Sequence, residues 1–232
     1  MNLLDQFLWV IFPYLSVVVF VVGHIFRYRY DQFNWTAKSS EFIEKKRLMI
    51  GSLLFHIGII PVIFGHVGGL LIPKSWTEAF GISNHMYHTV ALYIGGIFGV
   101  ITFAGMLILT ARRFTMSTIR KLSSASDLIV NALLLFIIFM GMYSTLVTNH
   151  VQPEFDYRES ISIWFRDLFV FSPDASLMAA VPVSFKIHMI SGFLIFALWP
   201  FTRLVHVWSV PLNYARRSYI LYRKNRGQSV HH

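Results

Sequence analysis

Four histidines lie in apolar segments of this chain, where their chemistry is unusual. His56 and His66 stand ten positions apart in LFHIGIIPVIFGH, and His188 and His206 lie towards the two ends of FKIHMISGFLIFALWPFTRLVHVW. A histidine is costly at membrane depth, so such residues are functional candidates. An imidazole on the side of a helix can ligate haem iron. The four histidines therefore predict two b-type haems stacked across a bilayer.

The composition is that of an integral membrane protein. The 232 residues are 55% hydrophobic and only 13% charged, whereas soluble domains average about 25% charged residues. The formal charge of +9 comes from short basic runs between apolar segments, which suits loops beside anionic lipid and not nucleic-acid binding. Cysteine is absent, which excludes disulfides, cysteine-ligated clusters and covalent haem attachment in this chain. Residues 1–7 lack a basic region, so we expect no cleavable signal peptide.

Apolar runs of spanning length predict an all-α integral membrane protein, a bundle of five transmembrane helices. We expect one domain over residues 1–232, with a short basic tail at its C-terminus. The predicted spans are about 8–26, 50–72, 88–111, 128–147 and 184–203. The fourth span follows SSASD, where we expect Ser126 or Asp127 to cap the helix.

The basic residues predict how the bundle is oriented in the cell membrane. Sixteen of the twenty lysines and arginines fall in 27–49, 112–121 and 203–226. The positive-inside rule therefore predicts an N-terminus outside and a C-terminus in the cytoplasm. The segment IWFRDLFVF then lies outside, and its amphipathic pattern predicts a helix lying flat at the interface.

This topology predicts how the histidines pair. The second and fifth spans run in opposite directions, so antiparallel packing pairs His66 with His188 in the outer half of the membrane. It pairs His56 with His206 in the inner half. The eighteen positions from His188 to His206 make five full helical turns, which places both histidines on one face of a continuous helix. We expect Pro200, which lies between them, to kink or end that helix.

Small residues beside the histidines would give a flat macrocycle room against the backbone. They are Gly58, Gly65, Gly68, Gly69 and Gly192. The alternative for a single histidine is a polar contact with a neighbouring helix. For His24, at the inner end of the first span, we favour a polar contact at the membrane interface. A zinc site or a proton channel would need carboxylates at these depths, and none lies inside the spans.

Three stretches carry a family resemblance: RYRYDQFNWTAKSSE, LFHIGIIPVIFGHVGG and FTRLVHVWSVPLNY. Over essentially its whole length the chain resembles the gamma subunit of membrane-bound respiratory nitrate reductase, a cytochrome b subunit. The resemblance implies that His66 and His188 ligate the outer haem and that His56 and His206 ligate the inner one. It also implies oxidation of a quinol, expected to be menaquinol, near the outer face.

The resemblance further implies two protein partners on the cytoplasmic side. Electrons would pass from the outer haem to the inner one and then to an iron–sulfur beta subunit. A molybdenum-containing alpha subunit would finally reduce nitrate. The alternative keeps the dihaem architecture in a heterodisulfide-reductase-like or sulfur-metabolism complex.

Other polar residues suit supporting roles by their depth. His85 and His88 in GISNHMYH are candidates for the quinol site, because a histidine that titrates near neutrality can accept a quinol proton. The alternative is that both are solvated loop residues. Arg112 and Arg203 suit the propionates of the inner haem, and Lys186 suits those of the outer haem. Ordinary snorkelling explains these three cations equally well.

Overall fold

The computed structural model describes residues 2–30 and 42–208, and this part of the chain is helical with no strand. Five of its segments are long and apolar enough to cross a membrane: Leu3–Tyr30, Lys46–Leu71, Asn84–Thr115, Ala125–Val151 and Val183–Phe201. Each coincides with one predicted span, which confirms the five-span prediction. The predicted basic tail lies outside the described residues.

The five spans and their connections have the following bounds. The first span comprises α1 (Leu3–Gln6), the π-helix η1 (Phe7–Ile11) and α2 (Phe12–Tyr30). The second and third are α3 (Lys46–Leu71) and α5 (Asn84–Thr115), and the fourth comprises α7 (Ala125–Tyr143), the π-helix η3 (Ser144–Thr148) and α8 (Asn149–Val151). The fifth is α10 (Val183–Leu198) with the 3₁₀ turn η6 (Trp199–Phe201). Shorter elements connect or follow them: α4 (Lys74–Ala79), α6 (Ser117–Leu122), η4 (Tyr157–Glu159), α9 (Ile161–Phe169), η5 (Ala175–Met178) and η7 (Arg203–Val207).

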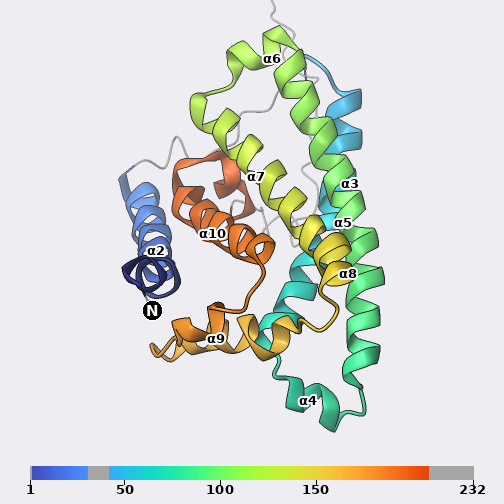
Figure 1. Ribbon diagram of the computed structural model, residues 1–232. Coiled ribbons are helices and arrows are strands. Elements are labelled where there is room, and N and C mark those ends of the chain that lie inside the picture. Colours follow the sequence, from blue (N-terminus) through green and yellow to red (C-terminus); the bar gives the residue numbers. More distant parts are fainter. Residues whose placement is uncertain (1, 31–41, 209–232) are drawn as a thin grey trace, which may run out of the picture.

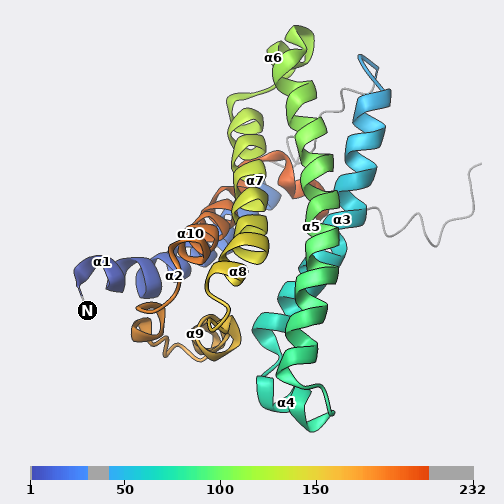
Figure 2. The same cartoon turned by 45° about the vertical axis from the view of Figure 1, so that its right-hand side comes forward.

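The spans form two groups joined through α7. In both views α2 and α10 lie together on one side, α3 and α5 lie together on the other, and α7 lies between (Figures 1 and 2). The helix α3, which carries His56 and His66, thus belongs to one group, and α10, which carries His188, belongs to the other. We call the two ends of the bundle the α9 end, which also holds α4, and the α6 end (Figure 1). The α9 end corresponds to the predicted outer side.

Glycines bring α3 and α5 into close contact. A Cβ atom at Gly105 would lie 2.3 Å from the backbone nitrogen of Phe55, and one at Gly58 would lie 2.4 Å from Oγ1 of Thr102. Only glycine allows two backbones to approach so closely. The close packing makes α3 and α5 one rigid unit, and this unit positions His56 and His66.

The fourth span begins with a capping box. The Oγ of Ser124 accepts a hydrogen bond from the backbone nitrogen of Asp127, and the Asp127 carboxylate accepts one from the backbone nitrogen of Ser124. The predicted cap at Ser126 or Asp127 is therefore wrong by a few positions, because Asp127 occupies the third helical position of the box.

The fifth span ends near Pro200, as the sequence predicts. α10 stops at Leu198, Pro200 lies in the following 3₁₀ turn, and Thr202 is extended with φ −126° and ψ 175°. His206 lies on the separate turn η7. The five-turn relation between His188 and His206 is therefore wrong, because no continuous helix joins them.

The helix α9 closes one end of the bundle. Trp164 is fully buried, and its indole nitrogen donates a 2.9 Å hydrogen bond to the carbonyl of Trp9. The same tryptophan packs edge-on against Phe193 of α10. The apolar face of α9 is thus covered by protein, which its amphipathic pattern alone does not reveal.

Candidate functional site

His66 and His188 face one another across the bundle. Their ring centres are 6.0 Å apart, with an angle of 34° between the ring planes. A metal ion held between two imidazole nitrogens, with bonds of about 2 Å, keeps the ring centres roughly 6 Å apart. The spacing is therefore compatible with one metal ion that these two imidazoles would hold between them.

All four histidines present the same nitrogen to a ligand. In each, Nδ1 lies within hydrogen-bonding distance of a backbone carbonyl, which can only accept, so Nδ1 carries the proton. Nε2 is then the nitrogen whose lone pair can bind a metal. The pairs are His56 with Ser52 at 2.7 Å, His66 with Val62 at 2.7 Å, His188 with Ile137 at 3.0 Å and His206 with Arg203 at 2.7 Å.

Two of these histidines are exposed on a spanning helix. His56 and His66 both lie on the surface of α3. An imidazole that faced lipid at this depth would be costly, so something other than lipid is expected to cover each ring. A haem held by Nε2 would do so.

The glycines divide into two kinds. A Cβ atom at Gly65, Gly68 or Gly192 would meet no atom within 4 Å, whereas Gly58 and Gly69 face side chains of neighbouring elements. The open glycines flank His66 and follow His188 by one helical turn. Their neighbourhood therefore has room for a flat macrocycle, while the other two glycines serve helix packing.

His56 and His206 both belong to the half of the bundle towards the α6 end. His56 lies on α3, and His206 lies exposed on η7. In the described part of the chain, the recorded ring contact of His56 is with Phe55 and not with His206. The structure thus brings one predicted pair into contact and leaves the other apart.

The environment of His188 includes a residue that the sequence did not indicate. A Cβ atom at Gly141 would lie 2.9 Å from Cε1 of His188. The π-helix η3 begins three residues later, and π-bulges are frequent at functional sites. Gly141 therefore belongs to the site as the residue whose small size admits the imidazole.

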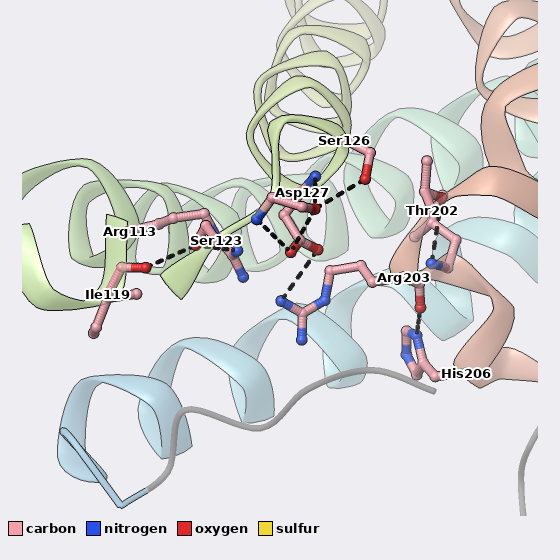
Figure 3. A network of polar contacts seen from close by, with 10 residues as sticks. Arg113, Ile119, Ser123, Ser126, Asp127, Thr202, Arg203 and His206 are labelled. Carbon is pink, nitrogen blue, oxygen red and sulfur yellow. Dashed lines mark hydrogen bonds and ion pairs between the residues drawn. The ribbon is translucent and has the colours of Figure 1, made fainter. Parts of the chain in front are cut away.

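Basic residues gather at the α6 end. Figure 3 shows Arg203 directed towards Asp127, with 3.9 Å between Nη1 and Oδ1. Arg113, another residue that sequence reasoning missed, donates a 2.9 Å hydrogen bond to Oγ of Ser123 in the same region (Figure 3). Of these two arginines only Arg203 pairs with a carboxylate among the contacts described, and the remaining positive charge suits an anionic ligand.

The other predicted cations are bound in different ways. Arg112 is only 3% exposed, and its Nε donates a 2.7 Å hydrogen bond to the carboxylate of Glu44. Lys186 is half-buried, and its Nζ lies 3.4 Å from the carbonyl of Ala179. Arg112 therefore ties the end of α5 to the segment before α3.

The predicted quinol-site histidines lie on the first turn of α5. His85 is exposed and His88 is half-buried. Between them, Tyr87 accepts a 3.4 Å hydrogen bond from the hydroxyl of Tyr157. Burial and this hydrogen bond raise the pKa of the Tyr157 hydroxyl, so it stays protonated. No recorded contact joins either histidine to His66 within the described ranges.

The described residues hold no group of three or more histidine, cysteine, aspartate or glutamate side chains that could bind a metal ion. A haem with two axial histidines does not need one, because the porphyrin supplies the remaining ligands. The interfacial role expected for His24 stays a prediction, because the polar contact of its Nδ1 lies within its own helix. Its Nδ1 lies 2.7 Å from the carbonyl of Phe20, and its ring centre lies 6.1 Å from that of Trp208.

Fold and site together define a multi-pass helical membrane protein in which a histidine of α3 faces a histidine of α10. The family model described as "Nitrate reductase gamma subunit" matches residues 5–225. The chain belongs to the nitrate reductase gamma subunit family.

Several curated relatives support this assignment. The nitrate reductase gamma chain of Bacillus subtilis is 51% identical over 219 residues, which cover 94% of this chain and 98% of that protein. The respiratory nitrate reductase 2 gamma chain of Escherichia coli is 36% identical over 96% of this chain and 98% of its own length. The nitrate reductase-like protein NarX of Mycobacterium tuberculosis is 41% identical over 96% of this chain but only 34% of its own length.

Proposed function

We propose that this chain is the dihaem b-type cytochrome subunit of a quinol-oxidising respiratory nitrate reductase. The single observation that carries the proposal is the 6.0 Å separation of the His66 and His188 ring centres. Two spans from different parts of the sequence bring these rings to the spacing that one metal ion requires. Family membership favours nitrate over sulfur metabolism as the process served.

The proposal assigns one haem to each half of the bundle. His66 and His188 hold the haem near the α9 end, and His56 and His206 hold the other near the α6 end. When bound, haem iron supplies one-electron transfer between its ferric and ferrous states. The Nδ1 hydrogen bonds fix each imidazole so that Nε2 faces the iron, and they raise its strength as a ligand.

The surrounding residues orient the two cofactors. The open space at Gly65, Gly68 and Gly192 admits the outer macrocycle. Arg203 and Arg113 supply positive charge at the α6 end for the propionates of the inner haem. In the proposal Lys186 contacts the propionates of the outer haem and Arg112 those of the inner haem. Arg112 also donates a hydrogen bond to the Glu44 carboxylate.

Quinol oxidation is proposed at the α9 end, which we place outside the membrane. Oxidation of one quinol would release two protons and two electrons there. Both protons would pass to the outer aqueous phase, one by way of His88 with His85 beside it, and the electrons would leave towards the haem that His66 and His188 would hold. The opposite end, with its basic loops, meets a cytoplasmic iron–sulfur beta subunit and through it a molybdenum-containing alpha subunit. Menaquinol is the proposed electron donor.

The first experiment is a dithionite-reduced minus oxidised absorption spectrum of the purified complex, with the haem quantified as pyridine haemochrome. We expect a b-type spectrum with two haems per gamma chain. A folded complex with no haem in this chain would overturn the proposal, because the histidines would then have no electron-transfer role.

A further inference from the structure

Arg158 is a buried cation at the α9 end. It lies on η4 and is only 3% exposed. Its Nη2 donates a 2.9 Å hydrogen bond to Oγ1 of Thr77, and its guanidinium carbon lies 3.9 Å from the ring centre of Tyr87. Its Nε and Nη1 are buried and have no hydrogen-bond partner among the described residues. Two nitrogen donors of this permanently charged side chain thus have no acceptor among the described residues.

The neighbouring carboxylates do not fill this role. Both Asp156 and Glu159 pair with Lys74, whose Nζ lies 3.6 Å from the first and 2.5 Å from the second. Asp156 also accepts hydrogen bonds from the side chain of Asn84 and from the backbone nitrogen, not the guanidinium, of Arg158. Within the described residues no carboxylate pairs with the Arg158 guanidinium, although a buried charge is stabilised by a counter-ion.

The guanidinium lies close to the turn that follows His66. Gly69 is three residues further along α3, and a Cβ atom there would lie 3.2 Å from the hydroxyl of Tyr87 and 2.7 Å from that of Tyr157. Residues three apart share one side of a helix. Because Arg158 covers the ring of Tyr87, its guanidinium lies near the helical turn of α3 that follows His66.

We propose that Arg158 binds a propionate carboxylate of the haem held by His66 and His188, and this inference rests on the proposed function. A propionate is attached to a cofactor inside the protein and can reach a buried guanidinium. The phosphate of a lipid headgroup contacts a protein at its surface, whereas the Arg158 side chain is almost completely buried. The structure thus favours Arg158 over the half-buried Lys186 as the principal cation for the outer haem.

The test is a redox titration of the whole complex carrying Arg158→Gln. Loss of the cation leaves the propionate charge uncompensated, which favours ferric iron. We therefore expect a lower midpoint potential, with a new pH dependence, for the haem that His66→Ala removes and for that haem alone. Arg166→Gln is the matched control, because Arg166 lies at the same end but donates to the carbonyl of Leu70. Its two potentials should match those of the wild type.

A second measurement does not depend on the folding of a variant. Wild-type protein freed of haem is reconstituted with haemin or with haemin dimethyl ester, whose propionates are neutral. We expect about a tenfold weaker affinity of the ester for the outer site, the size of one lost charge-assisted hydrogen bond. Equal affinities there would overturn the inference.

The outcomes separate this inference from the proposed function. Absence of two haems from the wild-type complex would contradict the proposed function itself. Two haems in the wild type, with unchanged potentials in a folded Arg158→Gln complex, would contradict only the role of Arg158. Stabilisation of the wild type but not of Arg158→Gln by phosphatidylglycerol vesicles, with unchanged potentials, would assign the anion to lipid phosphate and also overturn the inference.

Discussion

Gly141 leaves just enough space for His188 to reach the neighbouring helix. A Cβ atom at position 141 would stand 2.9 Å from Cε1 of the imidazole, whose Nδ1 donates to the Ile137 carbonyl 3.0 Å away. Real Cβ atoms essentially never show contacts below 3.0 Å. The glycine and the carbonyl thus act together, since the first admits the ring and the second orients it.

We therefore predict that Gly141→Ala disturbs one haem only. The methyl group displaces the imidazole and weakens its bond to Ile137, and loss of such an orienting contact typically lowers metal affinity about tenfold or more. Electron paramagnetic resonance should show a changed low-spin signal for the haem that His188 ligates. Gly99→Ala is the control, because its Cβ would lie 3.5 Å from Met142 in ordinary contact. An unaltered spectrum in Gly141→Ala would contradict the prediction.

Substitution of the ligands tests the pairing. We expect His66→Ala and His188→Ala to abolish the same component of the optical redox titration, because each removes one of two axial bonds to one iron. His56→Ala and His206→Ala should both abolish the other component. A variant from one pair that removed the component assigned to the other pair would refute the assignment.

His88→Ala tests the quinol site. We expect quinol turnover to slow by about two orders of magnitude, the lower end of the contribution of a positioned proton acceptor, while both haems stay bound. His150→Ala, a histidine exposed at the end of the fourth span, is the matched control and should turn over normally. Wild-type kinetics in His88→Ala would instead make it a solvated residue.

The contact between Arg112 and Glu44 predicts a pH dependence of stability. The backbone amide of Arg47, followed by the Arg112 guanidinium, holds the pKa of the Glu44 carboxyl below its ordinary value. A lowered folded-state pKa stabilises the protein above the ordinary pKa of glutamate, and this contribution is lost as the pH falls through the folded value. We expect the thermal midpoint of Glu44→Gln to be a few degrees lower near neutral pH, with a smaller difference in acid. An equal difference at both pH values would count against the contact.

Glycine at the α3–α5 contact predicts a loss of stability on enlargement. Gly105→Ala would drive a methyl group into the backbone of Phe55, 2.3 Å away. We expect a cost of about 1–3 kcal/mol, the usual range for overpacking, read as a lower unfolding midpoint in detergent. Gly95→Ala, which meets open space, should change stability far less. Comparable losses in both variants would contradict the role of close packing at Gly105, since alanine itself favours a helix over glycine.

The spans could be predicted because length and composition are local properties. A helix long enough to cross a bilayer needs about 20 apolar residues, and each of the five runs contains them. The meeting of His66 and His188 also followed from topology, since two antiparallel spans place residues of similar depth side by side. The structure contains this contact, while the role of the two histidines as iron ligands stays a prediction.

What the sequence could not provide depends on contacts between distant residues. The bond from His188 to Ile137 joins positions 51 apart, and no local pattern marks its acceptor. Trp9 and Trp164, 155 positions apart, pack together in the core, because α9 folds over the end of the bundle. The helical relation of His188 to His206 failed at Pro200, beyond which helical periodicity no longer applies.

The four imidazoles differ in what holds them, and this difference sets the order in which the sites can assemble. His56, His66 and His206 each donate to a carbonyl within four residues of themselves, so their orientation is set as soon as their own turn forms. His188 donates to another helix. Its orientation must wait until α10 has docked on α7. In a nascent chain His56, His66 and His206 would therefore be oriented by their own helical turns, and His188 would be oriented only once the tertiary structure has formed. Binding of the haem proposed for His66 and His188 would then require a completely folded bundle.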